Sequence, residues 1–79
     1  MVNARVRARR SGVLRLQVEL GDHVERKQTL GVIGDTFGDR VSTIRAPFGG
    51  VVLGVARHPL VHRGDAVVHV AAYESPAAS

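Results

Sequence analysis

The segment Gly12-Val13-Leu14, in which a glycine opens an apolar run, returns later in the chain as Gly50-Val51-Val52. Each copy leads to a matched segment, residues 24–30 and 61–67, and closes on an aliphatic stretch. A chain of 79 residues makes one domain, in which about 60% of the unfolded surface becomes buried. Neither copy alone could bury its apolar face, so the repeat predicts two interlocked halves of one domain.

The composition favours β-structure without disulfide bonds or membrane spans. Fourteen valines and two isoleucines give a β-branched bias that suits strands better than helices. The chain has no cysteine and therefore no disulfide framework or thiolate metal site. Charges and glycines interrupt every apolar run before the ~20 residues that a membrane span needs. The basic N-terminus lacks the apolar segment of a signal peptide, so we expect a cytoplasmic protein with no membrane partner.

Short strands at regular spacing, separated by glycine-containing corners, indicate an all-β barrel or sandwich. The clearest period of two places Leu14, Leu16, Val18 and Leu20 on one face. We expect one β domain at residues 1–72, with half one at about 3–45, half two at about 46–72, and a flexible tail at 73–79. The expected strands are residues 3–9, 14–20, 29–33, 40–45, 51–55 and 65–72.

Five glycines are the candidate structural turn residues of this fold. Sharp corners need a positive φ or a close approach of two backbones, and glycine accepts both without strain. The five are Gly12, Gly21, Gly31, Gly50 and Gly64.

The positive charge of the chain raises the question of a nucleic-acid partner. The net charge is +4 and the pI is about 11.1, as in many nucleic-acid-binding domains. Only Arg5–Arg10 forms a basic cluster, however, and it lacks the aromatic residues on which single-stranded bases stack. Nucleic acid is therefore not the expected partner.

No pattern of catalytic or metal-binding residues emerges from the sequence. His58 and His62 are four residues apart, but Pro59 argues against the helix that would place them on one face. In an extended chain they would lie roughly 13 Å apart, too far for one zinc ion. His69 alternates with valines and is expected to point outward. We expect no catalytic, cofactor or metal site on this chain.

The doubled pattern resembles the barrel-sandwich hybrid of biotinyl and lipoyl carrier domains over residues 11–71. In those families a lysine at the tip of the hairpin between the halves receives the cofactor. The hairpin here reads Gly34-Asp35-Thr36-Phe37-Gly38-Asp39, without lysine. The single lysine, Lys27, occupies the position matched by Gly64, where the pattern has glycine. The resemblance therefore implies the fold but not the carrier function.

A closer resemblance is to the C-terminal domain of the succinylglutamate desuccinylase/aspartoacylase family. It rests on the hairpin Asp35-Thr36-Phe37-Gly38 and on the run Ala46-Pro47-Phe48-Gly49-Gly50-Val51-Val52-Leu53-Gly54. In that family a zinc-dependent, carboxypeptidase-like domain with a His-x-x-Glu ligand pair precedes this segment, and no His-x-x-Glu occurs here. The resemblance implies a non-catalytic accessory domain that packs on a deacylase domain and shapes substrate access. The zinc would belong to that catalytic domain.

The hairpin of Asp35, Thr36, Phe37, Gly38 and Asp39 is the candidate contact with the catalytic domain. An aromatic side chain on a polar loop suggests packing against a partner, although Phe37 could instead fold onto its own core. The alternative function is a free-standing biotinyl/lipoyl-like interaction module without a cofactor lysine. Its exposed edge strands could pair with other copies to give a homo-oligomer.

Overall fold

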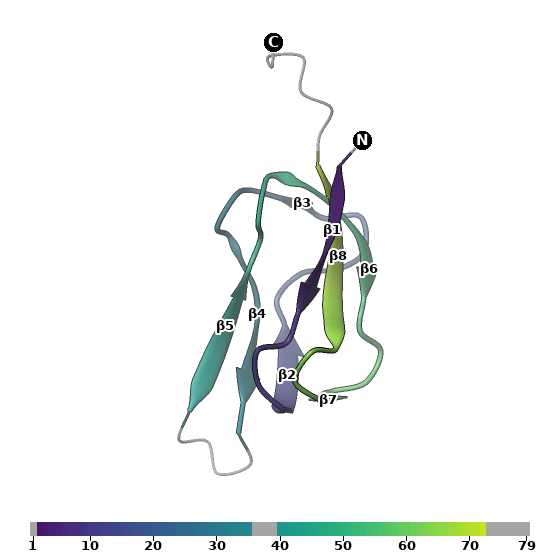
Figure 1. Cartoon of the computed structure of the whole chain (residues 1–79). Helices are drawn as coiled ribbons and strands as arrows, with labels where there is room; N and C mark the ends of the chain where they lie inside the picture. The colour runs from purple at the N-terminus through teal and green to yellow at the C-terminus, as the bar shows by residue number, and fades with distance from the viewer. Residues whose placement is uncertain (1, 36–39, 73–79) are drawn as a thin grey trace.

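The computed structural model describes residues 2–35 and 40–72, which form two antiparallel sheets and contain no helix (Figure 1). One sheet has the strand order β1-β8-β6-β3 and the other the order β5-β4-β2-β7. The strands are β1 (Asn3–Arg7), β2 (Gly12–Leu16), β3 (His23–Val24), β4 (Thr29–Gly34), β5 (Val41–Arg45), β6 (Gly50–Val55), β7 (Leu60–Val61) and β8 (Ala66–Ala72). The all-β class expected from the sequence is confirmed.

The two copies interlock, because each sheet takes strands from both. In the first sheet β8 and β6 form the centre while β1 and β3 form the edges; in the second, β4 and β2 are central between β5 and β7. Pairing of β1 with β8 corresponds to pairing of β5 with β4, and pairing of β3 with β6 corresponds to pairing of β7 with β2. Strands β1 to β4 are thus equivalent to β5 to β8. The boundary between equivalent segments lies between β4 and β5 rather than between residues 45 and 46.

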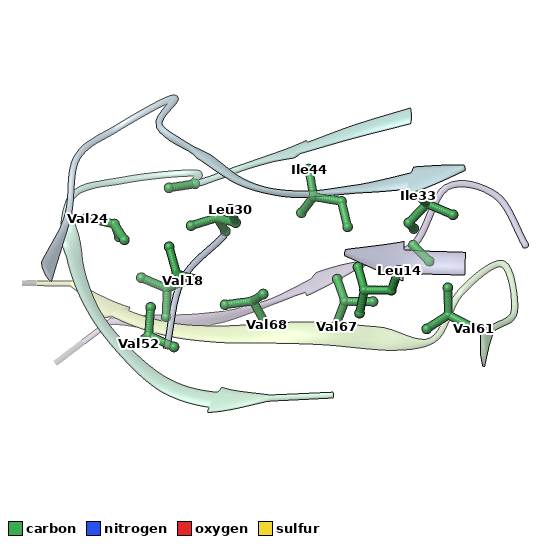
Figure 2. Close-up of a cluster of buried hydrophobic side chains, with 13 residues drawn as sticks. Leu14, Val18, Val24, Leu30, Ile33, Ile44, Val52, Val61, Val67 and Val68 are labelled. Atoms are coloured by element: carbon green, nitrogen blue, oxygen red, sulfur yellow. The ribbon is translucent and has the colours of Figure 1, made fainter. Parts of the chain in front are cut away.

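The core lies between the two sheets and is almost wholly aliphatic (Figure 2). Each sheet turns one face inward, so alternate residues of its strands meet alternate residues of the other sheet. Val52 and Val68 lie on one side of the core, and Leu30 and Ile44 on the other. The largest fully buried side chains are Leu30, Ile33, Val24, Val52, Val67, Val68 and Val70.

The strand expected at residues 14–20 is shorter than predicted, and its last apolar residue does not reach the core. Strand β2 ends at Leu16, and Leu20 is 61% exposed. The cause is the hydrogen bonding beyond residue 18. The Glu19 N–H donates to Asp22 Oδ2 (2.8 Å) and the Gly21 N–H donates to the Val52 carbonyl (2.8 Å), which turns the chain toward β6. Only Val18 continues the buried face.

Two short strands were also missed, because two residues carry no periodic signal. Strands β3 (His23–Val24) and β7 (Leu60–Val61) fall outside the six strands expected from the sequence. Each pairs at the edge of a sheet with a central strand.

Equivalent turns join β3 to β4 and β7 to β8, and in the first of them a lysine adopts the left-handed backbone conformation that favours glycine. Lys27 has φ +67° and its counterpart Gly64 has φ +95°. The N–H of Lys27 donates to the Ala46 carbonyl and that of Gly64 to the Ala8 carbonyl, both at 2.8 Å.

A side chain closes each of these turns in the same way. The Glu25 N–H donates to Gln28 Oε1 at 2.9 Å, and the His62 N–H donates to Asp65 Oδ2 at 2.8 Å. The turn therefore keeps its geometry where lysine replaces glycine, because the surrounding hydrogen bonds hold the backbone in place.

Three further glycines, Gly12, Gly31 and Gly50, permit close approach of neighbouring backbones. A Cβ on Gly12 would collide with the Gly34 carbonyl oxygen, and one on Gly50 with that of Ala71. Gly31 has the Arg15 carbonyl oxygen 2.7 Å from where its Cβ would be. Gly21, like Gly64, has a positive φ (+86°).

Replacing Lys27 with glycine should stabilise the protein. A non-glycine residue in the left-handed region destabilises the folded state by about 1–2 kcal/mol. Glycine avoids this strain, but its greater backbone entropy in the unfolded chain offsets roughly half of the gain. We expect Lys27→Gly to raise the free energy of unfolding in urea by about 0.5–1 kcal/mol, and Gly64→Lys to lower it by a similar amount. Arg26→Gly, one residue away, is the control and should be destabilising; a gain equal to that of Lys27→Gly would contradict this account.

Candidate partner-contact surface

The hairpin expected to contact a catalytic domain lies almost entirely outside the described residues. Of its five members only Asp35 is described, while Thr36, Phe37, Gly38 and Asp39 are not. Asp35 is half-buried, and its N–H donates to the Arg40 carbonyl at 3.1 Å. The described ends of β4 and β5 lie at the opposite end of the molecule from the start of β1 (Figure 1).

An apolar row crosses the outer face of the second sheet at this same end. Val41 pairs with Gly34, Gly34 with Val13, and Val13 with Leu60. Residues paired across antiparallel strands project to the same face of the sheet. The neighbours Leu14, Ile33 and Val61 are buried, so the row faces outward. We call Val41, Gly34, Val13 and Leu60 the apolar row.

The two ends of the apolar row are among the most exposed large apolar side chains of the described residues. Val41 is 62% exposed and Leu60 is 71% exposed, and Val13 between them is half-buried. Val32, one row further along β4, is also half-buried, and its neighbours across the sheet are Arg15 and Thr43. Apolar side chains gathered on one exposed face with a polar margin are typical of contact surfaces.

The fold itself does not require apolar residues at the ends of this row. The equivalent row on the other sheet is Asn3, Ala71, Val51 and His23, joined by the corresponding pairings. Asn3 stands where the second sheet has Val41, and His23 where it has Leu60. Since the same scaffold accepts polar residues at equivalent positions, the fold does not depend on apolar side chains at positions 41 and 60.

The histidines do not assemble into a metal site. His58 and His62 are exposed, and His69 is half-buried with its Nε2 3.1 Å from Asn3 Oδ1. Within residues 2–35 and 40–72, no three His, Asp or Glu side chains are grouped as metal ligands. Nor does this part of the chain hold a helix long and apolar enough to cross a membrane.

Arg45, at the end of β5, contacts the turn at Lys27. Its guanidinium donates to the Lys27 carbonyl (3.2 Å) and lies 3.3 Å from Thr29 Oγ1. The equivalent Arg7 donates to the Gly64 carbonyl at 2.9 Å. Both arginines therefore tie an edge strand to a turn that joins the two sheets.

No family model and no curated protein matches the sequence, but solved structures share its fold. A succinylglutamate desuccinylase/aspartoacylase from Rhodobacter sphaeroides matches with a TM-score of 0.79 and 29% identity over 85% of this chain and 21% of its own. The ectoine utilization protein EutE (DoeB) from Ruegeria pomeroyi matches with a TM-score of 0.78 and 24% identity over 86% of this chain and 22% of its own.

A single-chain, multi-domain long-chain acyl-CoA carboxylase also shares the fold, with a TM-score of 0.78 and 17% identity over 95% of this chain and 8% of its own. The chain thus spans about a fifth of the length of the desuccinylase/aspartoacylase proteins that it matches. Its structural neighbours include several proteins of that family, each considerably larger than this domain.

Exchanging the row's exposed ends for their equivalents should leave stability unchanged. Val41→Asn with Leu60→His copies Asn3 and His23 onto the second sheet, at exposed positions where substitutions typically change stability by less than ~0.5 kcal/mol. Leu30→Ala, in the core, should cost about 2–5 kcal/mol. Urea unfolding measures both. A loss above ~1 kcal/mol in the double variant would mean that the row serves the fold.

Proposed function

We propose that this chain is the β accessory domain of a succinylglutamate desuccinylase/aspartoacylase family enzyme, a zinc-dependent N-acyl amino acid deacylase. The fold would be the barrel-sandwich hybrid of biotinyl and lipoyl domains, without a carrier lysine. The interlocked sheets and the likeness to the Rhodobacter sphaeroides protein, at 29% identity, support this assignment. The chemistry and the zinc would lie in a catalytic domain, and this chain would contribute no reacting group.

The observation that carries the proposal is the apolar row on an otherwise symmetric scaffold. An accessory domain needs a surface that a larger partner can cover, and the row with exposed Val41 and Leu60 and half-buried Val13 offers one. Burial of such side chains contributes about 25 cal/mol per Å² of apolar area. The neighbouring hairpin, residues 35–39, remains the candidate for a second contact close to the substrate entrance.

The role proposed for the domain is to restrict access to the active site rather than to take part in bond making. A folded domain held beside a catalytic cleft excludes water and orients long substrates. Its removal would therefore change KM and substrate preference more than the chemical step.

A chimera tests this proposal. This chain would replace the matched fifth of the Rhodobacter sphaeroides protein, and the kcat/KM for an N-acyl amino acid hydrolysed by that protein would be measured. We expect the chimera to be active and Val41→Asn with Leu60→His to lower kcat/KM about tenfold, because loss of a contact worth ~1.4 kcal/mol has that effect.

Leu53→Asn is the matched control, since Leu53 is 51% exposed but lies on β6 of the other sheet. It should leave kcat/KM unchanged. An active chimera that responds equally to both substitutions, or to neither, would rule out the apolar row as the contact surface. A chimera that folds but hydrolyses nothing would count against the family assignment.

A further inference from the structure

A groove on the pseudo-twofold axis separates the two open edges of the sheets. Val6 and Ile44, which are equivalent in the repeat, line it together with the equivalent pair Arg7 and Arg45, and Arg9 and Thr43 lie beside them. Its volume is about 210 Å³. It is distinct from the apolar row, whose side chains project from the outer face of the second sheet.

Strands β1 and β5, beside the groove, are outermost in their sheets, so within residues 2–35 and 40–72 no strand pairs with one side of each backbone. On β1, the Ala72 N–H donates to the Val2 carbonyl (2.7 Å) and the Ala8 N–H to the Asp65 carbonyl (2.8 Å). Hydrogen-bonded and non-hydrogen-bonded pairs alternate along an antiparallel ladder. Asn3, Arg5 and Arg7 therefore direct their N–H and C=O groups away from β8.

The same alternation holds on β5. The Asp35 N–H donates to the Arg40 carbonyl at 3.1 Å, so the backbone groups of Val41 and Thr43 point away from β4. Open strand edges of this kind accept a further strand through main-chain hydrogen bonds.

The charge of the groove selects among possible strands. Three arginines, Arg7, Arg9 and Arg45, are among the described residues that line it, and no carboxylate is. A second copy of this chain would bring arginines against arginines, and such repulsion is one way in which proteins protect an open edge. A strand with carboxylates would instead form charge-assisted hydrogen bonds with the guanidinium groups.

The side-chain directions on β1 and β5 determine which residues an added strand would need on each of its faces. Arg5 and Arg7 are exposed on the outer side of β1, whereas Val6 and Ile44 face inward. Partners directly opposite in a ladder share a face. The added strand would therefore place acidic residues outside, beside the arginines, and apolar residues inside, on Val6 and Ile44.

We propose that this groove binds an extended acidic segment of a partner protein, with acidic and apolar residues alternating, as an additional strand on β1. This deepens the proposed function, on which the identity of the partner rests, by naming a further contact besides the apolar row and the hairpin. Among the described residues that line the groove, none is an aromatic residue on which a nucleic-acid base could stack. The open edge of β1 can instead form main-chain hydrogen bonds with a peptide strand.

The test uses the intact chain and a blocked hexapeptide in which glutamate alternates with valine or threonine. We expect binding in low salt that weakens as salt rises, with changes in the amide NMR signals of Asn3, Arg5 and Arg7. Arg9→Gln should weaken binding about threefold, as expected for one exposed charge pair. Arg57→Gln, an exposed arginine outside the groove, should leave it unchanged.

Two further peptides separate strand pairing from charge attraction. The first is a hexapeptide of the same composition with its glutamates grouped, which has the same charge but no alternation of acidic and apolar residues. The second is N-methylated on the residues that would pair with β1, so it cannot form the main-chain hydrogen bonds of a strand. Both should bind at least about fivefold more weakly. Equal binding of all three peptides, or an unchanged affinity of Arg9→Gln, would overturn the proposal.

Tighter binding of an eight-nucleotide thymidine strand would assign the groove to nucleic acid instead. The peptide assay involves no catalytic domain, so its failure would leave the proposed function standing. Failure of the chimera would, conversely, leave the groove and its peptide intact.

Discussion

The fold depends on the constraint that neither copy of the repeat can form a sheet alone. Each copy supplies the two central strands of one sheet and the two edge strands of the other. Two backbone hydrogen bonds connect the copies at equivalent turns: the Lys27 N–H donates to the Ala46 carbonyl, and the Gly64 N–H donates to the Ala8 carbonyl. Small residues are needed where strands come closest, as at Gly12 and Gly50. Because each copy contributes strands to both sheets, the two sheets enclose a single core of aliphatic side chains.

The sequence was sufficient for the all-β class and for the interlocked halves, because those features rest on a repeat that spans most of the chain. It was insufficient at Leu20, where local hydrogen bonds to Asp22 and Val52 override a regular alternation. Strands as short as β3 and β7 have no detectable period. The positive φ of Lys27 could only have been expected by setting the lysine against Gly64 in the other copy.

The apolar row was not predicted, because it is formed by register across four strands rather than along one. A signal was nevertheless present. Superposing the two copies puts Val41 against Asn3 and Leu60 against His23, and a polar residue at one member of each pair shows that the apolar one is not needed for folding. The expected hairpin contact, Asp35–Asp39, stays a prediction, since all but Asp35 lie outside the described residues.

The two proposed contacts suit partners of different form. The apolar row lies on a flat sheet face and would be covered by a folded domain, whereas the groove between β1 and β5 has open backbone edges and would take an extended segment. The two copies of the repeat therefore give the molecule two different surfaces. The outer face of the second sheet carries the apolar row, which the first sheet lacks, whereas the groove between β1 and β5 is lined by arginines from both copies.

If one sheet face meets a catalytic domain while the equivalent face does not, amide hydrogen exchange should distinguish the two faces. Exchange would be compared between the chain alone and the same chain within the desuccinylase/aspartoacylase chimera. We expect slower exchange in the chimera around Val13, Gly34, Val41 and Leu60, and unchanged exchange around the equivalent Asn3, Val51 and His23. Protection of both rows to the same extent, or of the Asn3 row alone, would contradict this expectation.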